Sequence, residues 1–190
     1  MTVYFITHPE VEIDPAVPVA QWKLSARGIA RMQLGAAQPW SRVVRQIHCS
    51  TERKAIDSAA ILAAARGLGY AQDAGLGEND RSATGYLPRA EFETVADEFF
   101  AAPERSVRGW ERAVDAQARI VAAVARVTRN APDGDVAIIA HGGVGALLLC
   151  HLAGEPISRR ADQPGDGGGN FFAFERRSWA LRHRWRAIDG

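Results

Sequence analysis

The hydrophobic residues of the chain fall into two kinds of pattern, and these predict strands and helices in alternation. Residues 2–7 (TVYFIT) and 136–140 (VAIIA) are apolar at nearly every position. Such runs are typical of strands buried on both faces of a parallel sheet. A third strand is predicted over residues 43–50 (VVRQIHCS). The chain therefore opens with a central strand and returns to the same sheet at least twice.

Longer segments repeat their apolar residues at helical spacing. They lie at about residues 27–37, 51–69, 106–129 and 145–154, and Ser25 is a candidate N-cap of the first. Each of the three strands is followed by a helix, which is the order of a parallel α/β unit. The final segment reads as a glycine-rich loop and two antiparallel strands.

Residues 72–102 interrupt this alternation. They are rich in Gly, Asp, Pro and isolated aromatic residues, and they contain one short predicted helix near residues 90–99. Long irregular segments are often functional. We expect one domain over residues 1–190, in which residues 72–102 form an insertion that covers the pocket.

Composition limits the classes of function. The 190 residues carry 23 basic and 22 acidic side chains, which is too balanced for a protein that coats nucleic acid or an anionic membrane. Cys49 and Cys150 both lie beside apolar runs, so two buried, reduced thiols are expected rather than a disulfide. No apolar run approaches the roughly 20 residues that span a bilayer, and the first residues do not resemble a signal peptide. A cytoplasmic protein of unknown oligomeric state is expected, with neither a nucleic-acid nor a membrane partner.

Two histidines mark the place where chemistry is expected. His8 directly follows residues 2–7, and His141 directly follows residues 136–140. Ligands of open α/β sheets bind beyond the carboxyl ends of the strands, and both imidazoles would lie at that edge. A pair of this kind suits a metal centre, an acid/base pair, or a nucleophile with a phosphate-binding partner. A metal is disfavoured because no acidic residue or third histidine stands at ligand spacing.

Three further segments carry candidate residues. Gly142 opens a helix whose free N–H groups suit an anion. Residues 50–55 bring Arg53 and Lys54 to a strand-to-helix junction, where Ser50 or Thr51 could cap the helix; residues 76–78 place Glu78 in the irregular segment. Taken singly, each is an ordinary turn or polar loop.

Taken in order, these pieces resemble the histidine phosphatase superfamily, also called the phosphoglycerate mutase-like family, over essentially the whole chain. The family shows Arg-His-Gly, Ser-x-x-x-Arg-Ala, Leu-x-Glu and His-Gly motifs. The matching segments here are Thr7-His8-Pro9, Ser50-Thr51-Glu52-Arg53-Lys54-Ala55, Leu76-Gly77-Glu78 and His141-Gly142-Gly143-Val144. The resemblance implies a three-layer α/β/α sandwich with a mostly parallel central sheet.

The resemblance also implies a reaction: metal-independent hydrolysis of a phosphomonoester through a phosphohistidine, with no cofactor. His8 is then the nucleophile, Glu78 the proton donor, and His141 the stabiliser of the phosphoryl group. The expected ligand is a small phosphorylated substrate or inorganic phosphate. Its expected phosphate-binding residues are Thr7, Arg53, Lys54 and Gly142, and Arg81 and Asn170 are candidates for the pocket lining.

The chain departs from the family pattern at its cations. Thr7 stands where the family has an arginine before the nucleophile, Pro9 replaces the glycine, and Lys54 replaces the second arginine. Neither Thr7 nor Lys54 has the bidentate fork of a guanidinium. The alternative is therefore a weak or inactive family member that binds a phosphorylated ligand or a partner. A nucleotide-binding module is disfavoured because GGVGALL lacks the third glycine of the dinucleotide fingerprint.

Overall fold

The computed structural model describes residues 1–130 and 132–190, and within them the chain forms one mixed sheet. Its strand order is β3-β2-β4-β1-β5-β6. The neighbouring pairs from β3 to β1 are parallel, whereas β5 runs antiparallel to β1 and β6 antiparallel to β5. The strands are β1 (Thr2–Thr7), β2 (Val44–Cys49), β3 (Ala71–Gln72), β4 (Asp135–Ala140), β5 (Asn170–Glu175) and β6 (Leu181–Ala187).

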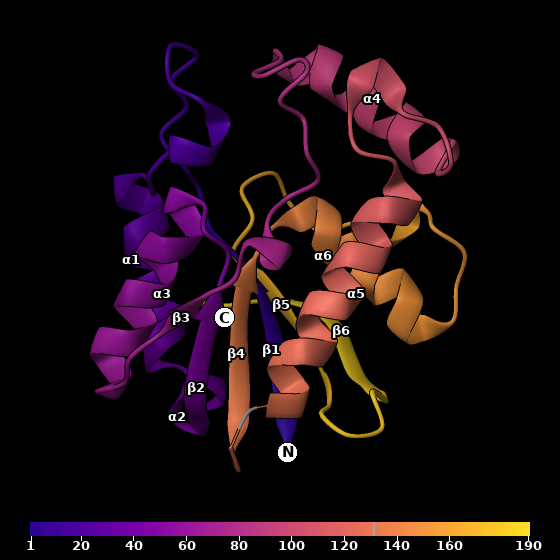
Figure 1. Cartoon of the computed structure of the whole chain (residues 1–190). Helices are drawn as coiled ribbons and strands as arrows, with labels where there is room; N and C mark the ends of the chain where they lie inside the picture. Colours follow the sequence, from indigo (N-terminus) through magenta and orange to yellow (C-terminus); the bar gives the residue numbers. More distant parts are fainter. Residues whose placement is uncertain (131) are drawn as a thin grey trace.

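Helices cover both faces of this sheet, which confirms the three-layer α/β/α fold. Figure 1 shows α1 and α3 on one side of the sheet and α5 and α6 on the other. The helices are α1 (Ala26–Ala37), α2 (Pro39–Arg42), α3 (Arg53–Arg66), α4 (Arg89–Ala101), α5 (Ala113–Asn130) and α6 (Gly142–Ala153). In the described part of the chain, no helix is both long and apolar enough to cross a bilayer.

The two faces of β1 and β4 explain why their sequences are apolar throughout. Val3 and Phe5 pack into a cluster with α5 and α6, whereas Ile6 packs into a second cluster with α1 and α3. In β4, Ile138 faces the first cluster and Ile139 the second. Both strands are thus buried on both faces, as predicted.

Most predicted element boundaries hold, and the caps explain them. The Ser25 hydroxyl accepts a hydrogen bond from the N–H of Gly28 (3.1 Å), so Ser25 is the N-cap of α1. The prediction that Ser50 or Thr51 caps α3 is wrong, because the N-cap residue is Glu52. The Ser50 hydroxyl instead accepts a hydrogen bond from the N–H of Glu52 (3.1 Å). Cys49 and Cys150 are buried free thiols, as expected.

The predicted helix over residues 106–129 begins later than its apolar pattern suggests. The α-helix starts at Ala113, because Arg108 and Gly109 have φ angles of 49° and 80°, which no α-helix accommodates. Trp110 therefore lies outside the helix. It is buried in the core, and its indole N–H donates to the Thr84 hydroxyl (2.9 Å). The apolar spacing over residues 106–129 therefore combines Trp110, which lies in a loop, with residues of the helix.

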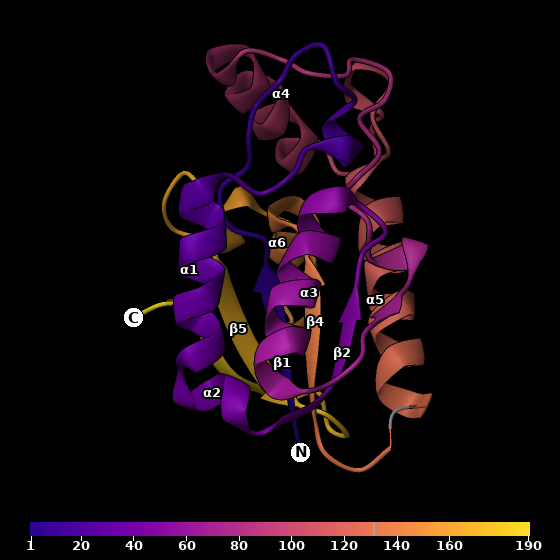
Figure 2. The ribbon, with the colours of Figure 1, turned by 90° about the vertical axis from the view of Figure 1, so that its left-hand side faces the viewer.

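Two segments rise above the carboxyl ends of the strands. Figure 2 shows the loop after β1 beside the chain that leads into α4, above the sheet. The predicted helix near residues 90–99 is α4, and its Val95 and Phe99 are anchored in the same cluster as α5 and α6. These two segments enclose the space where the functional side chains lie.

Candidate functional site

The structure brings His8 and His141 together. Since β1 and β4 are parallel neighbours, the residues that follow them meet at one edge of the sheet. The imidazole centroids lie 5.2 Å apart with an interplanar angle of 66°. The main-chain N–H of His8 donates to the carbonyl of Ala140 (3.1 Å), which ties the end of β1 to the end of β4.

One hydrogen bond sets the tautomer of His8. Its Nδ1 lies 2.8 Å from the carbonyl oxygen of Pro9. A carbonyl oxygen can only accept, so Nδ1 carries the proton and the Nε2 of a neutral ring keeps its lone pair. The half-buried His8 also lines a cavity of about 660 Å³. The arrangement presents a neutral imidazole with one nucleophilic nitrogen.

Both histidines are held in the neutral form. Burial, together with the nearby His141 and Lys54, lowers the pKa of His8 to about 3. Burial also lowers the pKa of His141, although Glu52 and Glu78 oppose that shift. Neutral histidines are nucleophilic, so this electrostatic setting suits an attacking nitrogen.

These shifts predict how stability depends on pH. Below pH 6.5 the unfolded chain binds a proton at His8, whereas the folded chain does not until about pH 3, so acid favours unfolding in that window. From pH 7 to pH 4.5, wild type should lose about 2 kcal/mol more unfolding free energy than His8→Ala. Urea titrations of both proteins at the two pH values measure this difference. Equal losses would contradict a neutral, buried His8.

The charge of Lys54 is compensated within the protein. Lys54 is buried, and its ammonium donates to the Glu52 carboxylate and to the carbonyl of Val19 (2.9 Å). Burial alone would raise the pKa of Glu52, but the neighbouring charges, that of Lys54 among them, lower it to about 2. Arg53 is exposed, pairs with Asp57 (2.7 Å), and is not among the cavity-lining residues described.

Glu78 occupies the N-terminus of α6. Its carboxylate oxygens accept hydrogen bonds from the N–H groups of Gly143 (3.0 Å) and Val144 (2.9 Å). The expected anion site at this helix start is therefore filled in part by the protein's own carboxylate. Gly143 is needed for this contact, because a Cβ there would lie 2.7 Å from Glu78 Oε1.

Thr7 points not to the cavity but to a buried polar cluster behind it. Its hydroxyl donates to Gln163 Oε1 (2.6 Å) and accepts from the N–H of Asn170 (3.0 Å). The Asn170 side-chain amide also donates to Gln163 Oε1 (3.2 Å). Two donors therefore fix the carboxamide oxygen of Gln163, and its Nε2 faces Gly142, 2.5 Å from where a Cβ would stand.

The predicted residues divide into a cavity wall and its support. His8, Glu78, Arg81 and Gly142 line the cavity. The fully buried His141 lies against His8, with its Nε2 2.9 Å from the Ser50 hydroxyl and 3.2 Å from Glu52 Oε1. Three other predicted residues are also buried and are not part of the described lining: Thr7, Lys54 and Asn170.

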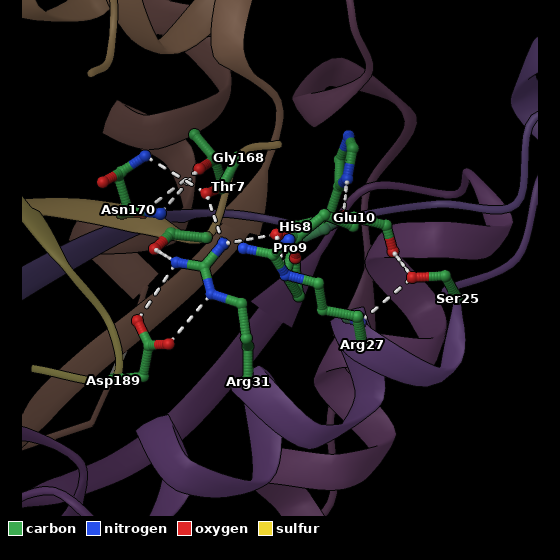
Figure 3. A network of polar contacts seen from close by, with 12 residues as sticks. Thr7, His8, Pro9, Glu10, Ser25, Arg27, Arg31, Gly168, Asn170 and Asp189 are labelled. Carbon is green, nitrogen blue, oxygen red and sulfur yellow. Dashed lines mark hydrogen bonds and ion pairs between the residues drawn. The ribbon is translucent and has the colours of Figure 1, made fainter. Parts of the chain in front are cut away.

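A second network holds the main chain of His8 in place. Figure 3 shows the Arg31 guanidinium between Asp189 and the carbonyl of Gly168, with Glu10 close by. The main-chain N–H of Gly169 donates to the carbonyl of His8 (3.1 Å). At Gly168, with a φ of 71°, a Cβ would lie 2.2 Å from the carbonyl oxygen of His8, so only glycine fits there.

Sequence reasoning missed two site residues, Glu52 and Gln163. Glu52 lies inside the quoted motif of residues 50–55, so a carboxylate two positions before Lys54 was a visible signal. Gln163 lies in a glycine-rich loop, and its role depends on contacts with Thr7, 156 residues away. Within the described residues, no three His, Cys, Asp or Glu side chains gather as a metal ion would require.

Comparisons with known proteins agree with this geometry. The profile of the histidine phosphatase superfamily (branch 1) matches residues 3–184. No curated protein sequence matches the chain. Among solved structures, Bacillus stearothermophilus YhfR superimposes with a TM-score of 0.80 at 21% identity, covering 96% of this chain and 94% of that one.

Two other solved structures share the fold. A mycobacterial glucosyl-3-phosphoglycerate phosphatase in complex with inorganic phosphate has a TM-score of 0.76 at 22% identity, covering 100% of this chain and 99% of that one. A phosphoserine phosphatase mutant from Entamoeba histolytica has a TM-score of 0.72 at 15% identity, covering 96% and 95%. With nearly the whole sequence matched by the profile, the chain belongs to the histidine phosphatase superfamily, branch 1.

Proposed function

We propose that this protein hydrolyses phosphomonoesters through a phosphohistidine on His8. The observation that carries the proposal is the bond from His8 Nδ1 to the Pro9 carbonyl, which leaves the Nε2 lone pair of a cavity-lining ring free to attack. Membership of the superfamily supports it, as do the names of two similar structures, which describe phosphatases.

The proposed reaction has two steps. In the first step Glu78 carries a proton: His8 Nε2 attacks phosphorus, the ester P–O bond breaks, and the proton of Glu78 passes to the leaving oxygen. A water molecule then gives its proton to the Glu78 carboxylate and attacks phosphorus; the P–N bond breaks, which releases inorganic phosphate and neutral His8. No step needs a metal ion or a cofactor.

His141 is proposed to stabilise the transferred group. The Nε2 of His141 lies 2.9 Å from the Ser50 hydroxyl and 3.2 Å from the Glu52 carboxylate, which can only accept, so Nε2 carries the proton of the neutral ring. The buried Nδ1 of His141 has no partner among the described residues. The negative charge of a phosphoryl group favours a second proton on Nδ1, which then donates to a phosphoryl oxygen.

Gln163 and Arg81 are proposed to take part of the role of the missing arginine. The Gln163 Nε2 lies over Gly142 in the same cavity as His8, and the structure describes no protein acceptor for it. Arg81 also lines the cavity and is near enough to influence His141. We propose that residues 1–190 act as one domain, with residues 72–102 as the roof of this cavity.

The same site gives a specific reason to consider the alternative, a binder without turnover. Thr7 stands in place of an arginine, and Glu52 neutralises Lys54. The expected phosphate-binding site therefore has less positive charge than the family motif provides. Phosphoryl transfer depends on such charge for most of its rate. A phosphate ligand that stabilises the protein without being hydrolysed would support this alternative.

The hydrolysis of aryl phosphates tests the proposal. Wild type, without added metal, should hydrolyse p-nitrophenyl and phenyl phosphate between pH 5 and pH 8. Glu78→Gln should lower kcat/KM, which reports the first step, by about 10²-fold for phenyl phosphate and less for p-nitrophenyl phosphate, whose better leaving group needs less protonation. Steady-state rates of both substrates give the comparison.

Glu91→Gln is the matched control, because Glu91 is an exposed carboxylate paired with Arg108 and should leave both rates unchanged. Equal losses for the two substrates in Glu78→Gln would exclude Glu78 as the proton donor. No hydrolysis by wild type, together with a thermal shift on adding phosphate, would favour the binder.

A further inference from the structure

The cavity beside His8 extends well past the space that a phosphoryl group needs. We infer that it takes substrates whose alcohol carries a bulky, apolar aromatic group. The inference rests on the proposed function, since the cavity is continuous with His8 and Glu78. Its volume of about 660 Å³ falls within the range of about 300–1,000 Å³ that is usual for pockets holding organic ligands.

Two aromatic rings close the outer part of the cavity. Trp22, from the loop after β1, and Tyr86, from the segment before α4, pack against each other with ring centroids 5.7 Å apart and an interplanar angle of 58°. The Trp22 indole N–H donates to the carbonyls of Asp14 (2.9 Å) and Val17 (3.0 Å), which fixes the ring. Two separate segments thus contribute packed aromatic rings to the wall of one cavity.

A further aromatic ring lines the cavity from α4. Phe92 is half-buried, and the Arg81 guanidinium lies over its ring, 5.0 Å from the centroid. Ile13, which is 62% exposed, and the 37% exposed Tyr86 are large apolar residues that face solvent, and both line this cavity. Exposed apolar surface of this kind is unfavourable unless a ligand covers it.

The charged residues of the cavity wall do not favour a second anionic group on the substrate. Arg81 is assigned above to the phosphoryl group, and of the other lining arginines Arg89 is paired with Asp166 (2.7 Å) and Arg159 with Glu93. Because these pairs compensate one another, the wall recognises shape and apolar area more than charge. Stacking between flat faces favours an aromatic ring over a flexible polar alcohol such as a sugar.

Two primary-alkyl esters test the inference, because their leaving alcohols differ in size but hardly in acidity: 2-(1-naphthyl)ethyl phosphate and ethyl phosphate. We expect kcat/KM to be about 10- to 100-fold higher for the naphthylethyl ester, the gain from burying one large ring. The matching phosphonates, which cannot be hydrolysed, should show the same preference in Kd. Adenosine 5′-monophosphate serves as the polar aromatic comparison.

Variants locate the preference. Tyr86→Ala should lower the naphthylethyl-to-ethyl ratio about tenfold, and Tyr86→Phe should restore it, because the ring is kept. Tyr70→Ala is the matched control: Tyr70 is 38% exposed, like Tyr86, but is not among the cavity-lining residues described.

The outcomes separate the inference from the proposed function. Equal kcat/KM and equal Kd for the two esters would overturn the inference while leaving the proposed hydrolysis standing. A preference in phosphonate binding without turnover of either ester would support the inference and contradict the hydrolysis. A preference for adenosine 5′-monophosphate over the naphthylethyl ester would overturn the assignment to apolar groups.

Discussion

His8→Ala should lower kcat by at least about 10⁴-fold, because the variant has no nitrogen that can take the phosphoryl group. The Nε2 of His8 is the nucleophile that the bond to the Pro9 carbonyl makes available. The variant should also lose the acid-labile label that wild type acquires when it is mixed with ³²P-labelled substrate and quenched. Rates and label are measured on the same protein samples.

The control for His8→Ala is His151→Ala. His151 is an exposed histidine near the end of α6, and it should keep both rate and label. Urea unfolding at pH 7 checks that His8→Ala is folded. A label that persists in His8→Ala would place the phosphohistidine elsewhere, with His141 as the nearest candidate.

The fold and the histidine pair could be predicted because both depend on local sequence patterns. Residues 2–7 and 136–140 are apolar throughout, since each strand is covered by helices on both faces. Once two such strands are parallel neighbours, the residues after them must meet, so the juxtaposition of His8 and His141 follows from the sequence order.

Other features could not be predicted because tertiary contacts determine them. The start of α5 depends on left-handed backbone at Arg108 and Gly109, which the apolar spacing around Trp110 conceals. The sequence indicates Glu78 as a candidate proton donor and the start of α6 as a candidate anion site. Only the fold shows that the Glu78 carboxylate itself accepts hydrogen bonds from the N–H groups of Gly143 and Val144.

The missing arginine is the clearest case of a change that the sequence shows but does not explain. Thr7 is fully buried, and its hydroxyl is used by Gln163 and Asn170. Thr7 therefore acts on the cavity through a second residue. Its hydroxyl sets which end of the Gln163 carboxamide faces Gly142. A neutral donor replaces a charged one, and a lower rate than that of an arginine-containing site is the expected consequence.

Gln163→Glu should lower kcat by about 10³-fold. The change keeps the shape of the side chain and the oxygen that Thr7 and Asn170 bind, but it replaces the N–H donor beside Gly142 by a charged acceptor. A carboxylate there repels the phosphoryl oxygens and removes a preorganised donor, which together place the loss at the upper end of the range for such groups. Single-turnover rates measure the step directly.

Two further variants show whether the loss in Gln163→Glu comes from the missing N–H donor and added charge at this site or from a general effect on the fold. Thr7→Val should cause a smaller loss than Gln163→Glu, because the carboxamide loses an anchor but keeps its N–H. Gln33→Glu makes the same isosteric change on the exposed face of α1 and should not alter the rate. If Gln163→Glu retained wild-type activity, the Gln163 amide would have no part in binding the phosphoryl group. Arg81, the lining arginine outside the ion pairs described, would then be the candidate to replace the missing arginine.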